Sequence, residues 1–327
     1  MIFADILSAT VLFAIPLLLV ALGGMFSERS GIVNIALEGI MIIGALCGCL
    51  YLRFTEQAGF GSSAPQLHML IAILIAAVAG ILFSMLLAFA SIHLKADQTI
   101  GGTALNMMAP ALAVIVTWGA QGQAQTTILI PKWIRITQES LGMTAGTDFL
   151  SRMLFKSLYL TTPLALLLLV AATLFLYKTK TGLRLRACGE HPQAADSVGI
   201  NVYHMRYLGV ALSGMLGGIG GLAFTVAAGS GFQSTVAGYG FLALAVMIFG
   251  NWKPLNILGA SLFFALFKII GSYAGMISFL PKFEGVKNAE YIYLMLPYVV
   301  TMIVLILTSK KSRAPKSEGI PYDKGGR

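Results

Sequence analysis

Apolar runs of about twenty residues recur along the whole chain, and this recurrence constrains the fold more than any other feature of the sequence. Such a run crosses the hydrocarbon core of a bilayer as an α-helix, whereas the strands of a membrane barrel have about ten residues and alternate strictly. We therefore predict an all-α, polytopic transmembrane helix bundle of about nine spans (roughly eight to ten). The runs lie at roughly 4–24, 33–52, 68–92, 98–119, 157–177, 203–228, 234–250, 254–275 and 290–308.

The composition supports lipid as the main solvent. Of the 327 residues, 57% are hydrophobic and 11% are charged, whereas an ordinary soluble domain has about 25% charged residues. The first run has no basic flank and no small-residue cleavage site, so we expect it to remain as a span. These observations argue against a soluble enzyme with a single signal segment.

The distribution of Lys and Arg predicts the orientation. If the C-terminal tail is placed in the cytoplasm, basic residues outside the spans favour the cytoplasmic side roughly two to one, which predicts a multi-pass protein of the cell membrane with its N-terminus out. We divide the chain into a transmembrane domain, 1–308, and a cytoplasmic basic tail, 309–327, expected to be a disordered anchor at the lipid surface. A tenth span hidden in 120–156 would break this alternation. Lys268 lies inside a span, where its ammonium either snorkels outward or faces a pathway.

Several kinds of chemistry have no motif in the sequence. The three cysteines, Cys47, Cys49 and Cys188, have no histidine cluster beside them, so we predict no disulfide and no metal site. The chain has neither a P-loop nor a dinucleotide fingerprint. We expect no cofactor, and any ATP must be bound by another polypeptide. Paired carboxylates and Ser/His constellations are absent from the spans, which argues against an enzyme.

A loop at 178–202 contains the segment "GEHPQAADSVGI", which predicts a short helix. Pro192 suits the first helical position and Gly199 suits a left-handed C-terminal cap. A helix this short needs something to pack against. It either docks a soluble partner or belongs to a plain basic loop that fixes topology.

The segment "RLRACGEHPQAADSVGIN" resembles the cytoplasmic coupling loop of permease subunits in ABC importers of the ribose, branched-chain amino acid and nucleoside branch. The segments "SGIVNIALEGIMIIGA", "QTIGGTALNMMAPAL" and "GFLALAVMIFGNWKPLNILGASLFF" extend the resemblance, although a bulky apolar residue is common where Gly102 stands. The forms "NIALEG" and "TALN" look closest to purine nucleoside permeases. The matching coupling residues are Gly189, Glu190, His191, Pro192, Ala194, Ala195, Gly199 and Ile200.

This resemblance implies ATP-driven alternating access for nucleosides. The implied partners are an ABC ATPase subunit, a second homologous permease subunit and an extracytoplasmic solute-binding lipoprotein, with no role for nucleic acid. A ribose-type sugar or a branched-chain amino acid is the alternative solute. A stand-alone secondary transporter is a weaker alternative, because only Glu38 lies inside a span as a candidate ion site.

Polar and aromatic residues in three segments are candidates for a solute pathway. Asn34 and Glu38 are four residues apart and share a helix face. Glu38 either lies in a first helical turn with Asn34 as its N-cap, or bonds to a neighbouring span, or faces the solute with Asn34. Thr103 and Asn106 share a face in the fourth run.

The second half is rich in glycine. Gly214 and Gly218, and Gly217 and Gly221, have the small-xxx-small spacing of closely packed membrane helices. The segment 229–240 breaks a span, which is tolerated where the backbone is covered or lines a cavity. Its candidate contacts are Phe232, Gln233 and Tyr239, which serve either a nucleobase or a helix interface. This break and the one near Asn34 lie five spans apart, as in an inverted repeat.

Overall fold

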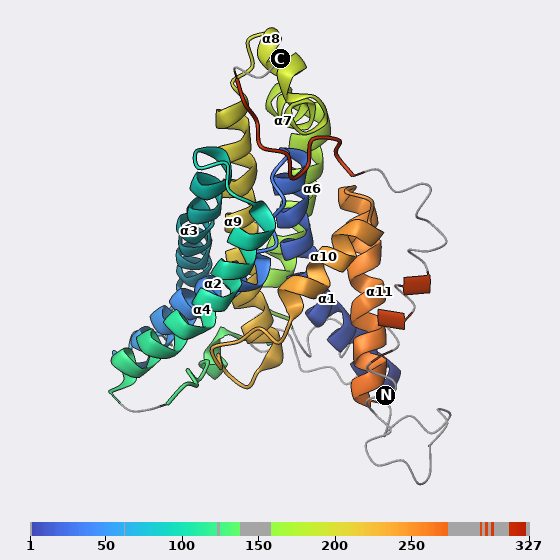
Figure 1. The fold of residues 1–327 in the computed structure, drawn as a ribbon. Coiled ribbons are helices and arrows are strands. Elements are labelled where there is room, and N and C mark those ends of the chain that lie inside the picture. The colour runs from blue at the N-terminus through green and yellow to red at the C-terminus, as the bar shows by residue number, and fades with distance from the viewer. Residues whose placement is uncertain are drawn as a thin grey trace.

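The computed structural model describes residues 2–61, 63–122, 125–137, 158–273 and 314–324, and the positions 295, 298–299 and 302–303. Within these ranges the chain forms α-helices and one short 3-10 helix (Figure 1). In chain order they are α1 (Ile2–Arg29), α2 (Leu37–Gln57), α3 (Pro65–Ile92), α4 (Gln98–Gln121), η1 (Lys132–Ile134), α6 (Thr161–Lys178), α7 (Lys180–Glu190), α8 (Pro192–Ser197), α9 (Val202–Ala228), α10 (Tyr239–Phe249) and α11 (Pro254–Tyr273).

The predicted all-α bundle is confirmed. Among the described residues, seven helices are long and apolar enough to cross a membrane, and α10 is a shorter apolar helix of 11 residues. The first eight predicted runs each coincide with one of these eight helices. The ninth, 290–308, lies mostly outside the described residues, as does much of the segment 120–156.

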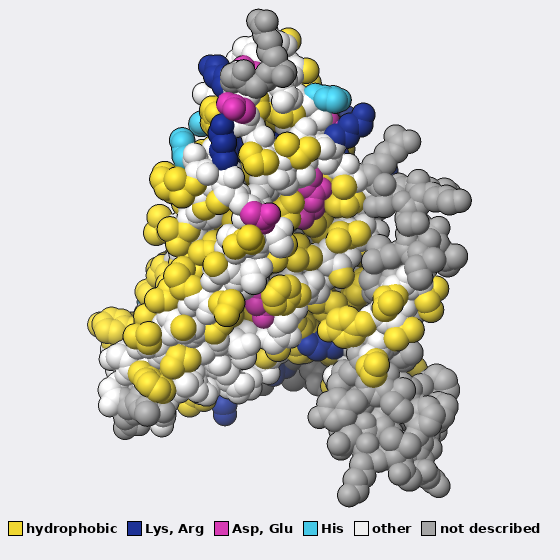
Figure 2. Space-filling model, in the orientation of Figure 1, with side chains coloured by type: hydrophobic (Ala, Val, Ile, Leu, Met, Phe, Trp, Pro, Cys, Tyr) yellow, Lys and Arg dark blue, Asp and Glu magenta, His cyan; other side chains and the backbone are white. Residues whose placement is uncertain are grey.

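Apolar side chains cover the flanks of the bundle. Leu82 on α3 is 66% exposed and Met107 on α4 is 75% exposed. Figure 2 shows such side chains spread over the middle of one face, while Lys, Arg and His gather toward the end that carries α8. This pattern is the one that a lipid-facing helix bundle requires.

The first and last groups of helices have the same plan. Long α1 and long α9 are each followed by an irregular segment, and α2 and α10 then begin inside the bundle. α3 packs against α9, while α11 packs against α1. This reciprocal packing is the arrangement expected of an inverted repeat.

Glycines on α9 allow its close contact with α2 and α3. A Cβ added at Gly221 would overlap the carbonyl oxygen of Met41 on α2, and one added at Gly218 would overlap the carbonyl oxygen of Ala76 on α3. Gly214 is equally close to Gly80. The small-residue packing predicted from the sequence is therefore confirmed.

The end of the bundle with α8 has two features that differ from the sequence prediction. Residues 180–190, predicted to be part of a loop, form the helix α7, whose start is capped because Thr179 Oγ1 accepts from the Gly182 N–H at 3.0 Å. Residues 314–324, predicted to be a disordered lipid anchor, pack across this end (Figure 1). We call them the strap. Their polar backbone is bound by protein, so this part of the tail needs no lipid surface.

The opposite end is covered by the segment 125–137. The indole of Trp133 lies edge-on to the His68 ring at 6.2 Å. Ile128 and Phe232 exchange both backbone hydrogen bonds, at 2.8 and 2.9 Å. Residues 125–137 are therefore a cap that joins the break before α10.

Candidate functional site

The break before α2 is held open by side chains from two other helices. α2 begins after Ala36, which has no side-chain cap. Asn106 of α4 replaces such a cap, because its Oδ1 accepts from the Gly39 N–H at 2.7 Å and its Nδ2 donates to the Ile35 carbonyl at 2.8 Å. Orphan backbone groups at a helix start are thereby satisfied inside the bundle.

The same segment has a second pair of supports. Gln98 Oε1 accepts from the Val33 N–H at 2.7 Å. Asn34 is fully buried, and its Nδ2 donates to Ser213 Oγ of α9 at 2.8 Å. Asn34 therefore lies before the helix and does not cap it. We call residues 30–36 the re-entrant segment, because they lead from the end of α1 back to the start of α2 inside the bundle.

Glu38 connects the two halves of the chain. It lies in the first turn of α2, is 7% exposed and reaches the start of α10. Its Oε1 accepts from the Gly238 N–H at 2.8 Å, and its Oε2 accepts from the Gly240 N–H at 2.6 Å. Of the three alternatives, the geometry is that of a bond to a neighbouring helix.

The starts of α2 and α10 lie against each other. A Cβ added at Gly240 would overlap the backbone of Glu38, so only glycine allows this approach. Each helix start carries a partial positive charge of about half a unit. The Glu38 carboxylate lies where both charges act on it, which stabilises an anion inside the bundle.

Lys268 is directed into the bundle and does not snorkel outward. Its Nζ lies 3.9 Å from the ring centroid of Tyr239, 5.5 Å from that of Phe13 and 5.9 Å from that of Phe224. These rings come from α10, α1 and α9. Tyr239 is 1% exposed, and its hydroxyl has no hydrogen-bond partner among the residues that the structure describes. The ammonium is stabilised by aromatic faces.

The other predicted pathway residues lie apart from this junction. Thr103 and Gln233 are exposed, and the Thr103 hydroxyl bonds to its own helix at Thr99. Phe232 is fully buried in the backbone bridge to Ile128. The structure thus brings together Asn34, Glu38, Asn106 and Tyr239 around two helix starts. Glu38 and Asn106 bond to protein through both of their polar atoms, Asn34 bonds through Nδ2 only, and among the described residues neither Asn34 Oδ1 nor the Tyr239 hydroxyl has a partner.

The sequence prediction missed several contributors to this junction: Gln98, Ser213 and two of the rings around Lys268, those of Phe13 and Phe224. Nothing in the sequence indicated the role of Ser213. The role of Gln98 could have been predicted, because an amide at the start of an apolar run needs a hydrogen-bond partner when it is buried. The aromatic rings come from three separate helices, so only the tertiary structure brings them together.

The helix α8 agrees with the sequence prediction. It begins with Pro192 at its first position, and Gly199 follows with a φ of 82°. His191 and Ala194 are exposed, whereas Ala195 is 4% exposed and packs with Cys188 and Val202. Ala194 is therefore on the face that a partner can reach.

Gly189 and Glu190 form the end of α7 beneath α8. Gly189 lies so close to the Arg29 carbonyl that a Cβ would overlap it, and Glu190 is half-buried. Burial raises the pKa of the neighbouring Cys188 thiol to about 11. That thiol stays neutral at physiological pH, and its environment is that of a packing residue.

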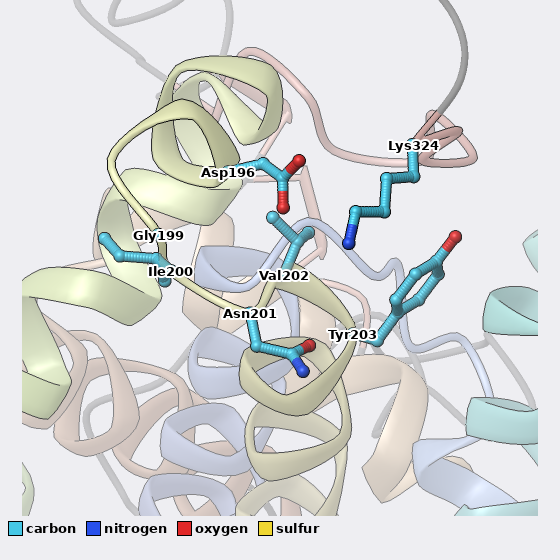
Figure 3. Close-up of a pocket in the computed structure, with 7 residues that line it drawn as sticks. All are labelled: Asp196, Gly199, Ile200, Asn201, Val202, Tyr203 and Lys324. Atoms are coloured by element: carbon cyan, nitrogen blue, oxygen red, sulfur yellow. The ribbon is translucent and has the colours of Figure 1, made fainter.

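A cavity of about 320 Å³ lies beside α8 (Figure 3). The side chains of Asp196, Tyr203 and Lys324 border one side of it, so an acid, an aromatic ring and a base lie together at the surface. Its lining is completed by Gly199, Ile200, Asn201 and Val202. The α8 end therefore has both a projecting helix and a polar hollow next to it.

Comparison with known proteins identifies relatives over nearly the whole chain. The family model described as "Branched-chain amino acid transport system / permease component" matches residues 6–307. The guanosine ABC transporter permease protein NupQ of Bacillus subtilis is 43% identical, with 98% of this chain and 97% of the relative covered.

Two relatives come from Lactococcus lactis. The nucleoside ABC transporter permease protein NupC is 41% identical, with 98% of this chain and 96% of the relative covered. The nucleoside ABC transporter permease protein NupB is 23% identical, with 95% and 83% covered. No solved structure matches the chain.

Proposed function

Because the chain belongs to the family of branched-chain amino acid transport permease components, we propose that it is a permease subunit of an ATP-binding cassette importer for nucleosides. The observation that carries the solute class is the full-length identity of 41–43% to relatives named for guanosine and nucleosides. The chain performs no covalent step. Its work is to expose a pathway alternately to the two sides of the membrane.

The helix α8 is the proposed docking element for the ATPase. It is short and projects from the end of the bundle, and both Ala194 within it and His191 directly before it are exposed. A short helix gains stability when a groove in a partner covers it. ATP is bound by that partner, and closure of the ATPase displaces α8.

The junction of α2 and α10 is the proposed centre of the pathway. Asn34, Glu38 and Asn106 fix the two helix starts, and Tyr239 supplies an aromatic face. Thr103 and Gln233 are proposed as further solute contacts outside this junction, since both side chains are exposed. Movement of the re-entrant segment against α10 would open this junction to one side.

The proposed orientation puts α8 in the cytoplasm and the start of α1 outside. α8 and the strap lie at one end of the bundle, and the start of α1 lies at the other (Figure 1). The excess of Lys and Arg on the α8 side supports this assignment.

The proposed partners are the ATPase, a solute-binding lipoprotein and a second permease. One organism has both NupC and NupB, each named a nucleoside permease, and this chain resembles NupC more. This pair of relatives supports a heterodimer of two different permeases.

The docking role is tested by Ala194→Arg, with Ala58→Arg as the matched control. Both alanines are exposed near helix ends, but Ala58 follows α2 at the opposite end of the bundle. Uptake of radiolabelled guanosine should be lost in Ala194→Arg at unchanged membrane abundance and kept in the control. Uptake that persists in Ala194→Arg would show that α8 does not dock the ATPase.

The solute class is tested separately with the partner lipoprotein. We expect unlabelled nucleosides to displace radiolabelled guanosine, and ribose or leucine to leave it bound. Displacement by ribose or leucine alone would reassign the solute.

The energy source is tested by collapsing the proton gradient while ATP is maintained. Uptake that stops under these conditions would identify a secondary transporter.

A further inference from the structure

The strap contacts the coupling region through its backbone. The Ser317 N–H donates to the Gly189 carbonyl of α7 at 2.9 Å, and Ser317 Oγ donates to the Glu190 carbonyl at 3.1 Å. Both acceptors lie in the last turn of α7, which is separated from α8 by His191 alone. The strap therefore holds the base of the helix that we assign to the ATPase.

The strap also contacts the re-entrant segment. The Gly319 N–H donates to the Gly31 carbonyl at 3.3 Å, two residues after Ser317. A Cβ added at Gly319 would lie 3.4 Å from Val33 Cγ2, so Gly319 faces Val33 across a narrow gap. One short stretch of chain thus touches both the base of α8 and the segment that starts α2.

A buried arginine reinforces this contact. Arg206 of α9 is 1% exposed, and its Nη2 donates to the Ile320 carbonyl of the strap at 3.0 Å. Its guanidinium also lies against Gly31, leaving room for no larger residue there without a shift. The guanidinium thus fills the space between the strap and the re-entrant segment.

An aromatic anchor joins the strap to α8 and α9. Tyr322 is 4% exposed, and its ring lies edge-on to that of Tyr203 at 5.4 Å. It packs in one cluster with Ala195 of α8 and Met205 of α9. An ion pair between Lys95 and Asp323 at 3.1 Å adds a contact to the loop before α4, but both side chains are largely exposed, so this pair contributes little.

We propose that the strap is a mechanical link that couples displacement of α8 to movement of the re-entrant segment, with Tyr322 and Arg206 as its positioning residues. The link rests on the proposed function, because it needs an ATPase that moves α8. Helix packing also connects α8 to the start of α2, through α9 and through α7 and α1, but the strap is bonded both to the base of α8 and to the re-entrant segment. Loss of the strap should therefore separate ATP hydrolysis from solute movement.

The test uses the complete complex in liposomes and compares Tyr322→Ala with Ile320→Ala. Ile320 is the matched control, because its side chain is 56% exposed and only its carbonyl binds Arg206. Tyr322→Ala should keep ATP hydrolysis but lower the nucleoside transported per ATP by about tenfold, a usual size for coupling between two sites. Ile320→Ala should behave as the parent does.

A second readout needs no solute. Val33→Cys is placed in the re-entrant segment, and its labelling rate by a soluble maleimide is measured with and without ATP, against the parent chain as blank. ATP should change this rate, and Tyr322→Ala or deletion of residues 314–327 should abolish the change while the complex still assembles. This readout does not depend on the identity of the solute. The solute assignment is tested separately, by guanosine uptake of the parent complex.

Three results would overturn the link. The first is an unchanged ratio of transport to ATP hydrolysis in both Tyr322→Ala and the deletion of residues 314–327. The second is a labelling rate of Val33→Cys, with the strap intact, that ATP does not alter. The third is loss of ATPase assembly in both Tyr322→Ala and the deletion. The last would make the strap a docking surface.

Discussion

The carboxylate of Glu38 is the junction between the two halves of the bundle, and its replacement by an amide tests that role. Glu38→Gln keeps the size and shape of the side chain. One oxygen still accepts from a backbone N–H, but the new NH₂ group faces the second N–H, so one of Gly238 and Gly240 loses its acceptor. The charge between the two helix starts is lost as well.

The size of the effect follows from these two losses. A buried N–H without a partner costs about 1–3 kcal/mol. Removing a favourable charge from a helix N-terminus costs about 0.3–2 kcal/mol. The substitution also removes the cost of burying the charge, which opposes the loss of the helix-dipole term. The unpaired N–H therefore dominates, and we expect a net cost of about 1–3 kcal/mol, a substantial part of the about 5–15 kcal/mol that separates most folded proteins from their unfolded state.

The measurement is thermal unfolding of the purified permease in detergent. We expect the Tm of Glu38→Gln to fall by several degrees, while Glu56→Gln, the same change on the same helix, leaves it unaltered. Glu56 is a fair control because it makes only a part-exposed ion pair with Arg53 at 3.0 Å. A Glu38→Gln variant with the parent Tm but a raised KM for guanosine would refute the structural role and return Glu38 to the solute.

Two further predictions concern packing and pH. Gly221→Ala should lower the amount of folded protein measured by size-exclusion chromatography, because the added methyl group overlaps the Met41 carbonyl and overpacking costs about 1–3 kcal/mol or more. The control Gly259→Ala, which adds its methyl group in open space on α11, should keep the parent level. Burial raises the pKa of the Glu318 carboxyl above 4.5, so docking of the strap is stabilised below that pH and this contribution is lost as pH rises through the raised pKa. Amide exchange at Ser317, corrected for its intrinsic pH dependence, should speed up over that window in the parent, and this acceleration should be absent in Glu318→Gln; equal profiles would contradict the assignment.

The spans were predictable because their signal is local. The length of an apolar run predicts a membrane helix, and the glycines at 229–240 indicated that α10 is shortened. The start of α8 at Pro192 was predictable for the same reason. α7 was missed because its charges and its low hydrophobicity are typical of a loop, and it forms a helix beside α6 and α9.

The site was predictable as a set of residues but not as a set of bonds. An amide and a carboxylate in an apolar segment indicate that partners exist. The partner of Glu38 lies 200 residues away in the chain, on the backbone of Gly238. A single sequence does not contain that pairing. The strap was predicted to be part of a lipid anchor because the whole tail, 309–327, is basic, and nothing in the sequence shows that Tyr322 is buried against Tyr203.

The distance along the chain between Glu38 and α10 has a consequence for how the protein is made. During synthesis α2 enters the membrane long before residues 238–240 leave the ribosome. Until they arrive, the nascent chain holds a carboxylate in or near lipid, at a cost of about 2.5–3.5 kcal/mol on insertion scales. The first half of the nascent chain therefore lacks the backbone partners of Glu38, and it reaches its stable packing only when α10 has been inserted.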